Sequence, residues 1–170
     1  MRAAIAQSRH AEGRTQSNPP VGCVILDKSG RLCAAAHTGL GGVPHAEKQA
    51  LDMAGKSAEG GTVYVTLEPC AHHGKTPPCI DALITARVAR IVVAVKDPDP
   101  RVNGRGLKKA RSAGIDIEFG VESEAAVAVL GGFLRRIEHG KPSVWLKTAA
   151  SLDGGIALYD GQKRWLTGSP

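Results

Sequence analysis

Three residues of this 170-residue chain, His45, Cys70 and Cys79, offer one imidazole and two thiolates, a ligand set used by catalytic zinc. Three protein ligands leave the fourth tetrahedral position open for water, whereas a structural zinc is closed by four ligands. Zinc lowers the pKa of such a water to about 7, which provides a nucleophile at neutral pH. Glu47 lies two residues after His45 and could carry protons for this reaction. The set therefore predicts metal-assisted hydrolysis.

Glu47 suits proton transfer better than metal binding. We expect a helix to begin at His45, and positions i and i+2 of a helix point about 200° apart. The order H-x-E, then P-C, then a second cysteine is the signature of zinc-dependent base deaminases, in which the glutamate is not a ligand. Here eight residues, and not two, separate Cys70 from Cys79. Both cysteines should lie near a helix start, where the partial positive charge stabilises thiolates.

Two alternatives to a catalytic zinc site remain open. His45 alone would be an ordinary polar loop residue, although its combination with Pro69-Cys70 after a strand favours a metal site. His72 and His73 lie between the two cysteines, and either could close a structural zinc as a fourth ligand. That alternative gives Glu47 no role, so we expect one catalytic zinc ion per chain.

The composition favours a cytoplasmic protein with one main domain. Hydrophobic residues make up 42% of the chain, which is enough for a core. No apolar run approaches the ~20 residues of a membrane span, and the N-terminus turns polar soon after Ile5, unlike a signal peptide. We expect no membrane partner. Reduced thiols are expected as well, with Cys23 and Cys33 packed in the core.

The charge is basic, with 22 Lys and Arg against 16 Asp and Glu, or +6 in total. A basic surface suits either nucleic acid or a phosphorylated small molecule. Basic residues are densest between Arg101 and Arg111, but Phe119 is the one aromatic residue nearby. The stacking side chains of a nucleic-acid groove are therefore missing, and a solvated helix face explains the far end of this run as well. We expect no nucleic-acid partner.

Alternating strands and helices predict an α/β fold. We expect helices over residues 1–12, 45–54, 79–86, 103–113 and 122–136, and strands over 21–26, 32–37, 62–67, 90–95 and 115–119. The composition changes after Lys141-Pro142, where residues 143–150 have the pattern of a further strand. Thirty residues cannot bury a core of their own. The prediction is one domain over residues 1–140 and a tail over 141–170.

The chain resembles one family of the riboflavin pathway, the diaminohydroxyphosphoribosylaminopyrimidine deaminases, which are usually fused to a reductase. The resemblance covers about residues 1–140. Its motifs are Asn18-Pro-Pro-Val-Gly-Cys-Val24, Pro44-His-Ala-Glu47, the run from Thr66 to Cys79, Asp97-Pro-Asp-Pro100 and Asn103-Gly-Arg-Gly106. The long loop between the cysteines is specific to this family among zinc deaminases, and it accounts for their wide spacing.

This resemblance implies a three-layer α/β/α cytidine deaminase-like fold with a central, mostly five-stranded mixed sheet. It implies hydrolysis of the exocyclic amine of 2,5-diamino-6-ribosylamino-4(3H)-pyrimidinone 5′-phosphate with release of ammonia. His45, Cys70 and Cys79 correspond to the zinc ligands and Glu47 to the proton shuttle. A homodimer or homotetramer is also implied.

We expect contacts with the substrate from Asn18, His37, His72, Lys75, Thr76, Asp97 and Asn103, and the first four match positions that family members use to hold the pyrimidine, ribose and phosphate. A phosphate needs cations and hydrogen-bond donors, and the loop between the cysteines offers His72, Lys75 and Thr76. Plainer roles remain open for several of them. Asn18 could stabilise a turn, Asp97 and Asp99 could cap the following helix, and Lys75 could be solvated.

The tail carries a second resemblance. Residues 147–154 and 165–168 are similar to the first strand and following loop of the fused NADPH-dependent reductase. Most of such a domain is missing from this chain, so we expect no functional NADPH site. Two other functions stay possible for the whole chain: a deaminase of nucleic acid, and a zinc-stabilised binding module without catalysis.

Overall fold

A computed structural model describes residues 1–72 and 77–156 of the chain. Within them, five strands form one mixed sheet in the order β2-β1-β3-β4-β5. The strands are β1 (Gly22–Leu26), β2 (Leu32–His37), β3 (Thr62–Leu67), β4 (Arg90–Val95) and β5 (Asp116–Phe119). β1 is antiparallel to both β2 and β3, whereas β3, β4 and β5 are parallel to one another.

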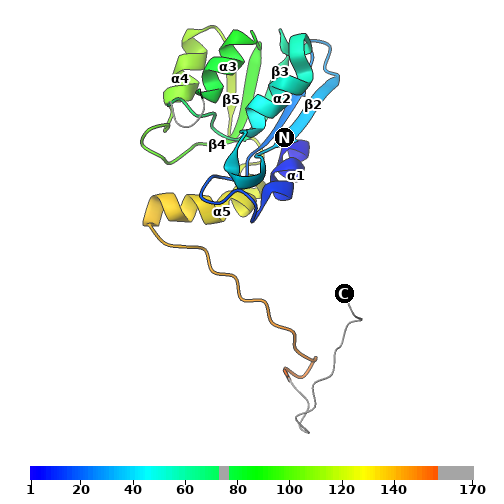
Figure 1. The fold of residues 1–170 in the computed structure, drawn as a ribbon, viewed down its shortest axis with the longest axis vertical. Helices are drawn as coiled ribbons and strands as arrows, with labels where there is room; N and C mark the ends of the chain where they lie inside the picture. The colour runs from blue at the N-terminus through cyan, green and yellow to red at the C-terminus, as the bar shows by residue number, and fades with distance from the viewer. Residues whose placement is uncertain (73–76, 157–170) are drawn as a thin grey trace.

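Helices cover both faces of this sheet (Figure 1). They are α1 (Arg2–Ala11), α2 (Ala46–Ala54), α3 (Cys79–Thr85), α4 (Arg105–Ser112) and α5 (Ser123–His139), with short 3-10 turns η1 (Leu40–Gly42) and η2 (Gly55–Ala58). α1 and α5 pack on one face, and α2, α3 and α4 lie on the other. The predicted three-layer α/β/α fold with a five-stranded mixed sheet is confirmed.

The central strands are buried on both faces, which explains why they are almost continuous runs of apolar residues. Successive residues point to opposite faces, and both are buried at Val65 and Thr66 of β3 and at Ile91 and Val92 of β4. The direction of the strands also fixes where a site can form. β2, β3 and β4 all run toward the same edge of the sheet, so the segments that follow them meet there.

The tail differs from its prediction. Residues 141–156 contain no helix or strand, so the strand predicted over residues 143–150 is wrong. A strand exists only where a neighbour pairs with its backbone N–H and C=O groups. Residues 141–156 instead extend away from the domain (Figure 1), and Trp145 is 87% exposed.

Two further predictions can be compared with the described residues. Cys23 is buried in the core and Cys33 is half-buried against it, and both are free thiols, as predicted. No helix in the described part of the chain has the length and apolar character needed to cross a membrane.

Candidate active site

A cavity of about 290 Å³ lies where the carboxyl ends of β2, β3 and β4 converge. Thr38 follows β2, Glu68 follows β3 and Asp97 follows β4, and all three line the cavity. The loop before β1 adds Asn18, and α5 adds Phe133. The cavity therefore collects residues from segments that are far apart in the sequence.

The three predicted zinc ligands meet at one end of this cavity. The Nδ1 atom of His45 lies 3.3 Å from Sγ of Cys79 and 3.7 Å from Sγ of Cys70. Zinc bonds of about 2.0 Å to nitrogen and 2.3 Å to sulfur, at a tetrahedral angle, would separate the two atoms by ~3.5 Å. The donor set and its spacing thus fit a zinc ion without rearrangement.

The ends of secondary-structure elements hold these ligands in place. His45 has extended backbone angles and immediately precedes α2, Cys70 follows β3, and Cys79 is the first residue of α3. The backbone N–H of Cys79 donates to Sγ of Cys70 over 3.2 Å. Hydrogen bonds from the Cys79 thiol and from His45 hold the pKa of Cys70 well below its usual range. Cys70 is therefore ready to bind a cation as a thiolate.

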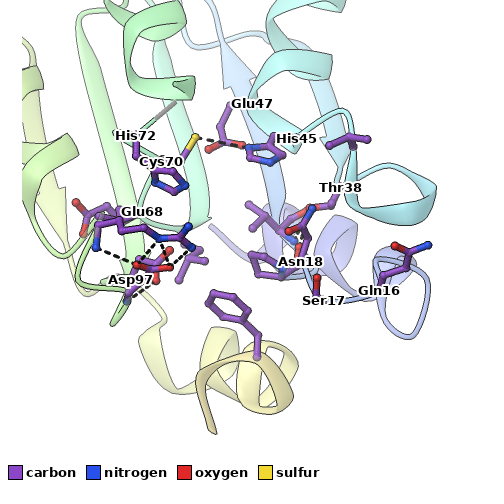
Figure 2. A pocket seen from close by; sticks show the side chains of 18 of the residues that line it. Gln16, Ser17, Asn18, Thr38, His45, Glu47, Glu68, Cys70, His72 and Asp97 are labelled. Atoms are coloured by element: carbon purple, nitrogen blue, oxygen red, sulfur yellow. Dashed lines mark hydrogen bonds and ion pairs between the residues drawn. The ribbon is translucent and has the colours of Figure 1, made fainter. Parts of the chain in front are cut away.

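Glu47 lies in the first turn of α2 and points into the cavity beside His45 (Figure 2). The two side chains share the cavity because His45 is not yet helical, so the 200° separation expected for a helix does not apply. Glu47 is only 4% exposed, and this burial raises its pKa to about 7, helped by the Cys70 thiolate. A carboxyl group with a pKa near neutrality can both accept and return a proton.

A fourth protein ligand is not found among the described residues. His45, Cys70 and Cys79 form the one metal-compatible group there, and neither Glu47 nor His72 belongs to it. His72 lines the cavity instead, and its buried Nδ1 atom has no hydrogen-bond partner among the described residues. The other expectations on this loop, for His73, Lys75 and Thr76, lie outside the described residues.

Asn18 faces the zinc ligands from the other side of the cavity (Figure 2). Its side-chain Nδ2 donates to the carbonyl oxygen of Gly42 over 2.9 Å. This bond fixes the amide plane and leaves the side-chain oxygen available to accept a hydrogen bond. The alternative role as a turn-forming side chain is not seen, because the turn here is closed by Thr15, whose hydroxyl donates to the Asn18 carbonyl.

His37 and Asn103, both expected to contact substrate, do not line the cavity. The Nδ1 atom of His37 lies 3.1 Å from the side-chain oxygen of Gln7, on the α1 side of the sheet. The next residue, Thr38, faces the cavity instead, since successive residues of a strand point to opposite faces. Asn103 is exposed in the turn before α4.

The loop that follows β4 presents acidic side chains to the cavity. Asp97 is buried and accepts a hydrogen bond from the backbone N–H of Asp99, and Asp99 pairs with Arg101. Neither carboxylate caps α4, which begins after Gly104 without a side-chain cap. Asp97 therefore lines the cavity, and the capping alternative does not hold.

Sequence reasoning missed several residues of the cavity wall: Gln16, Ser17, Thr38, Glu68, Arg101 and Phe133. Glu68 is the most informative of them, because it is buried and both of its carboxylate oxygens accept from the backbone N–H of Gly104 over 2.9 Å. It ties the loop after β4 to the end of β3. The sequence feature that could have identified Glu68 is its position directly before Pro69-Cys70.

Known proteins are similar to this chain in both sequence and fold. The chain is 47% identical to the riboflavin biosynthesis protein RibD of Escherichia coli over 167 residues, which are 98% of the chain and 45% of that protein. Among solved structures, Acinetobacter baumannii RibD is similar with a TM-score of 0.81 and 43% identity, over 98% of this chain and 47% of that one. The chain thus spans about half the length of the relatives it matches.

A third relative is the diaminohydroxyphosphoribosylaminopyrimidine deaminase/5-amino-6-(5-phosphoribosylamino)uracil reductase of Thermotoga maritima, with a TM-score of 0.89 and 39% identity over 99% of this chain and 48% of that one. Residues 1–95 match the model of the cytidine and deoxycytidylate deaminase zinc-binding region. This match includes His45, Glu47, Cys70 and Cys79. The chain belongs to the cytidine and deoxycytidylate deaminase family.

Proposed function

We propose that this chain is a zinc-dependent deaminase that removes the exocyclic amine of 2,5-diamino-6-ribosylamino-4(3H)-pyrimidinone 5′-phosphate, releasing ammonia, in riboflavin biosynthesis. One observation carries the proposal: the ligand atoms of His45, Cys70 and Cys79 converge beside the buried carboxyl of Glu47 at one end of a cavity. The substrate is proposed from the similarity to RibD proteins along nearly the whole chain.

In this mechanism His45, Cys70 and Cys79 hold the zinc ion. When bound, zinc acts as a Lewis acid that lowers the pKa of water to about 7. Glu47 accepts a proton from the attacking water as its oxygen adds to the amine-bearing ring carbon. The carboxyl gives this proton to the ring nitrogen, takes the second proton from the added hydroxyl and gives it to the leaving amine, and the carbon–nitrogen bond breaks to release ammonia. The pKa of about 7 that burial gives Glu47 supports a role in which the carboxyl accepts and returns a proton twice in each cycle.

We propose that Asn18, His72 and Asp97 contact the substrate, since all three line the cavity. The free amide oxygen of Asn18 suits a hydroxyl or amino group of the substrate. For Lys75 and Thr76, contact with the phosphate remains a prediction. Lys75→Ala should raise KM for the phosphorylated pyrimidine far more than for its dephosphorylated analogue, and equal effects would contradict the phosphate assignment.

Glu47→Gln tests the mechanism. The variant keeps the shape of the side chain but cannot accept the proton, so kcat for ammonia release should fall by roughly 10²- to 10⁴-fold. Zinc content, measured by metal analysis, should stay near that of the unchanged chain. Glu124→Gln is a matched control, because Glu124 also lies in the first turn of a helix but is exposed on α5. Its activity should not change.

The outcome that contradicts the mechanism is equally specific. If Glu47→Gln loses its zinc and unfolds, the carboxyl is structural.

The substrate is tested separately, by ammonia release from the pyrimidine phosphate with cytidine, guanine and tRNA as competitors. Inhibition by tRNA would favour a nucleic-acid deaminase. Such an enzyme stacks the flipped base on aromatic side chains, and Phe133 is the one Phe, Tyr or Trp among the described residues of the cavity wall.

We further propose that residues 1–140 form the deaminase domain and that residues 141–170 correspond to the opening of a reductase domain. Two facts support this boundary: α5 ends at His139, and the matched relatives are about twice as long. We also propose a homodimer or homotetramer in the cytoplasm. The family resemblance supports this oligomer, and light scattering would measure its molar mass in solution.

A further inference from the structure

The part of the cavity wall built by the loop after β4 holds a charged pair that the proposed mechanism does not use. Asp99 and Arg101 both line the cavity. The Nε atom of Arg101 lies 3.0 and 3.1 Å from the two carboxylate oxygens of Asp99, and Nη2 lies 2.6 Å from one of them. The backbone N–H of Arg101 donates to the same carboxylate over 2.9 Å. The guanidinium is therefore held in one orientation.

Arg101 is the one lysine or arginine among the described residues that line the cavity, whereas the same residues include the carboxyl groups of Glu47, Glu68, Asp97 and Asp99. A phosphate monoester would be repelled from such a wall unless a cation faced it. Hydrogen bonds from Arg101 lower the pKa of Asp99 to about 2, so the pair stays ionised at neutral pH. Arg101 is thus the cation that this part of the wall supplies.

The guanidinium also has donors to spare. Of its five N–H groups, the pair with Asp99 uses one on Nε and one on Nη2. The two on Nη1 have no partner among the described residues, and a planar guanidinium can hold one anion on each of two edges. The side chain is 68% exposed, which places it at the open part of the cavity and not among the buried zinc ligands.

We propose that Arg101 binds the phosphate of the substrate through Nη1, and that Asp99 is a positioning residue that orients the guanidinium. This rests on the proposed function for the identity of the substrate. It adds an anion contact on the loop after β4 that is separate from the one predicted for Lys75. The pyrimidine then reaches toward the zinc end while its phosphate stays at the rim.

Arg101→Ala tests this contact by steady-state kinetics on the full chain. KM for the phosphorylated pyrimidine should rise by roughly 10- to 100-fold, the value of one charge-assisted hydrogen-bonded contact, with kcat changed little. KM for the dephosphorylated analogue should stay within a factor of about two. Arg101→Lys should recover part of the affinity, and Asp99→Asn should lose part of it. Arg105→Ala is the control, because Arg105 is exposed on α4 outside the cavity wall and should change neither KM.

A second measurement separates this contact from the proposed reaction. Inorganic phosphate should raise the Tm of the unchanged chain, and Arg101→Ala should abolish most of that rise. Equal effects on both substrates, or an undiminished rise of Tm, would overturn the anion contact. If the unchanged chain releases no ammonia from either pyrimidine, the proposed function fails, and the phosphate effect on Tm alone decides the role of Arg101.

Discussion

The two ends of the cavity are built differently. The metal end consists of His45, Glu47, Cys70 and Cys79, which lie at or near element boundaries; Glu47 and Cys79 are buried, and His45 and Cys70 are half-buried. The recognition end consists of the loop before β1 (residues 16–18), the loop after β4 (residues 97–102), Glu68, which holds that loop, and Phe133 of α5. Side-chain hydrogen bonds hold these loops: Asn18 bonds to Gly42, Arg136 of α5 donates to the carbonyl oxygen of Ser17, and Glu68 accepts from Gly104 just after the second loop.

This difference separates the chemistry from the choice of substrate. The metal end can vary little, because any shift of a helix start or strand end moves a ligand out of the zinc sphere. The recognition end can exchange side chains without disturbing the sheet. A change at the metal end should therefore abolish the reaction, and a change at the recognition end should alter KM.

Cys70→Ala should have the largest effect. It removes one of three ligands, so zinc content should fall and ammonia release should drop to the background of the assay. Cys33→Ala is the matched control, since Cys33 is a half-buried thiol of β2 with no place in the metal group. A Cys70→Ala variant that kept both zinc and activity would show that the metal end is not the reaction centre.

The metal end could be predicted from the sequence for the same reason that it tolerates little change. Only a few residue types bind zinc, and His45, Cys70 and Cys79 stand next to turns and strand ends that the pattern already marks. The buried strands β3 and β4 were predicted residue for residue, because strands covered on both faces are almost continuous apolar runs. Each of these signals is local in the sequence.

The recognition end could not be predicted in this way. Glu68 and Gly104 are 36 residues apart, and nothing local indicates that they meet. Phe133 has the pattern of an ordinary helix residue, and the orientation of Arg101 depends on the fold of its loop. His37 was expected in the cavity, but the pleat of β2 directs it toward α1. Long-range packing decided each of these positions.

Glu68→Ala should have the next largest effect. The backbone N–H of Gly104 would lose its charged acceptor, which should lower the free energy of unfolding by about 2–3 kcal/mol in urea titrations. The loop after β4 would no longer be held to β3, so KM should rise while zinc content stays unchanged. Glu68→Gln should recover part of both losses, since its side-chain oxygen can still accept. A loss of zinc in Glu68→Ala would place Glu68 at the metal end instead.

Gly42→Ala should displace the side chain of Asn18. A Cβ atom on Gly42 would lie 2.8 Å from both Cβ and Cγ of Asn18, and the φ of +94° at Gly42 disfavours any side chain. We expect a loss of about 2 kcal/mol in stability together with a higher KM. Gly30→Ala is the control, because Gly30 has a φ of +81° with nothing within 4 Å. It should cost stability but leave KM unchanged. If KM is unchanged in Gly42→Ala, Asn18 does not contact the substrate.

Asp97→Asn should have the smallest effect, and one that depends on pH. Burial raises the pKa of Asp97 to about 6, and the neighbouring Asp99 and Glu68 carboxylates contribute. The pKa in the unfolded chain is about 3.9, so the folded chain holds more protons between about pH 4 and 6. The free energy of unfolding therefore falls as pH rises through that window.

Asparagine keeps the oxygen that accepts the backbone N–H of Asp99, but it has no proton to lose. Relative to the unchanged chain, Asp97→Asn should therefore gain about 1–2 kcal/mol more at pH 7.5 than at pH 4.5, less than the full pKa shift implies because the carboxyl borders a cavity open to solvent. Urea unfolding at the two pH values measures this difference. If Asp97→Asn also lowers the deaminase activity, the buried carboxyl of Asp97 contributes to substrate binding although it destabilises the folded chain at neutral pH. Parallel pH curves for the two chains would show that Asp97 ionises as an ordinary surface acid.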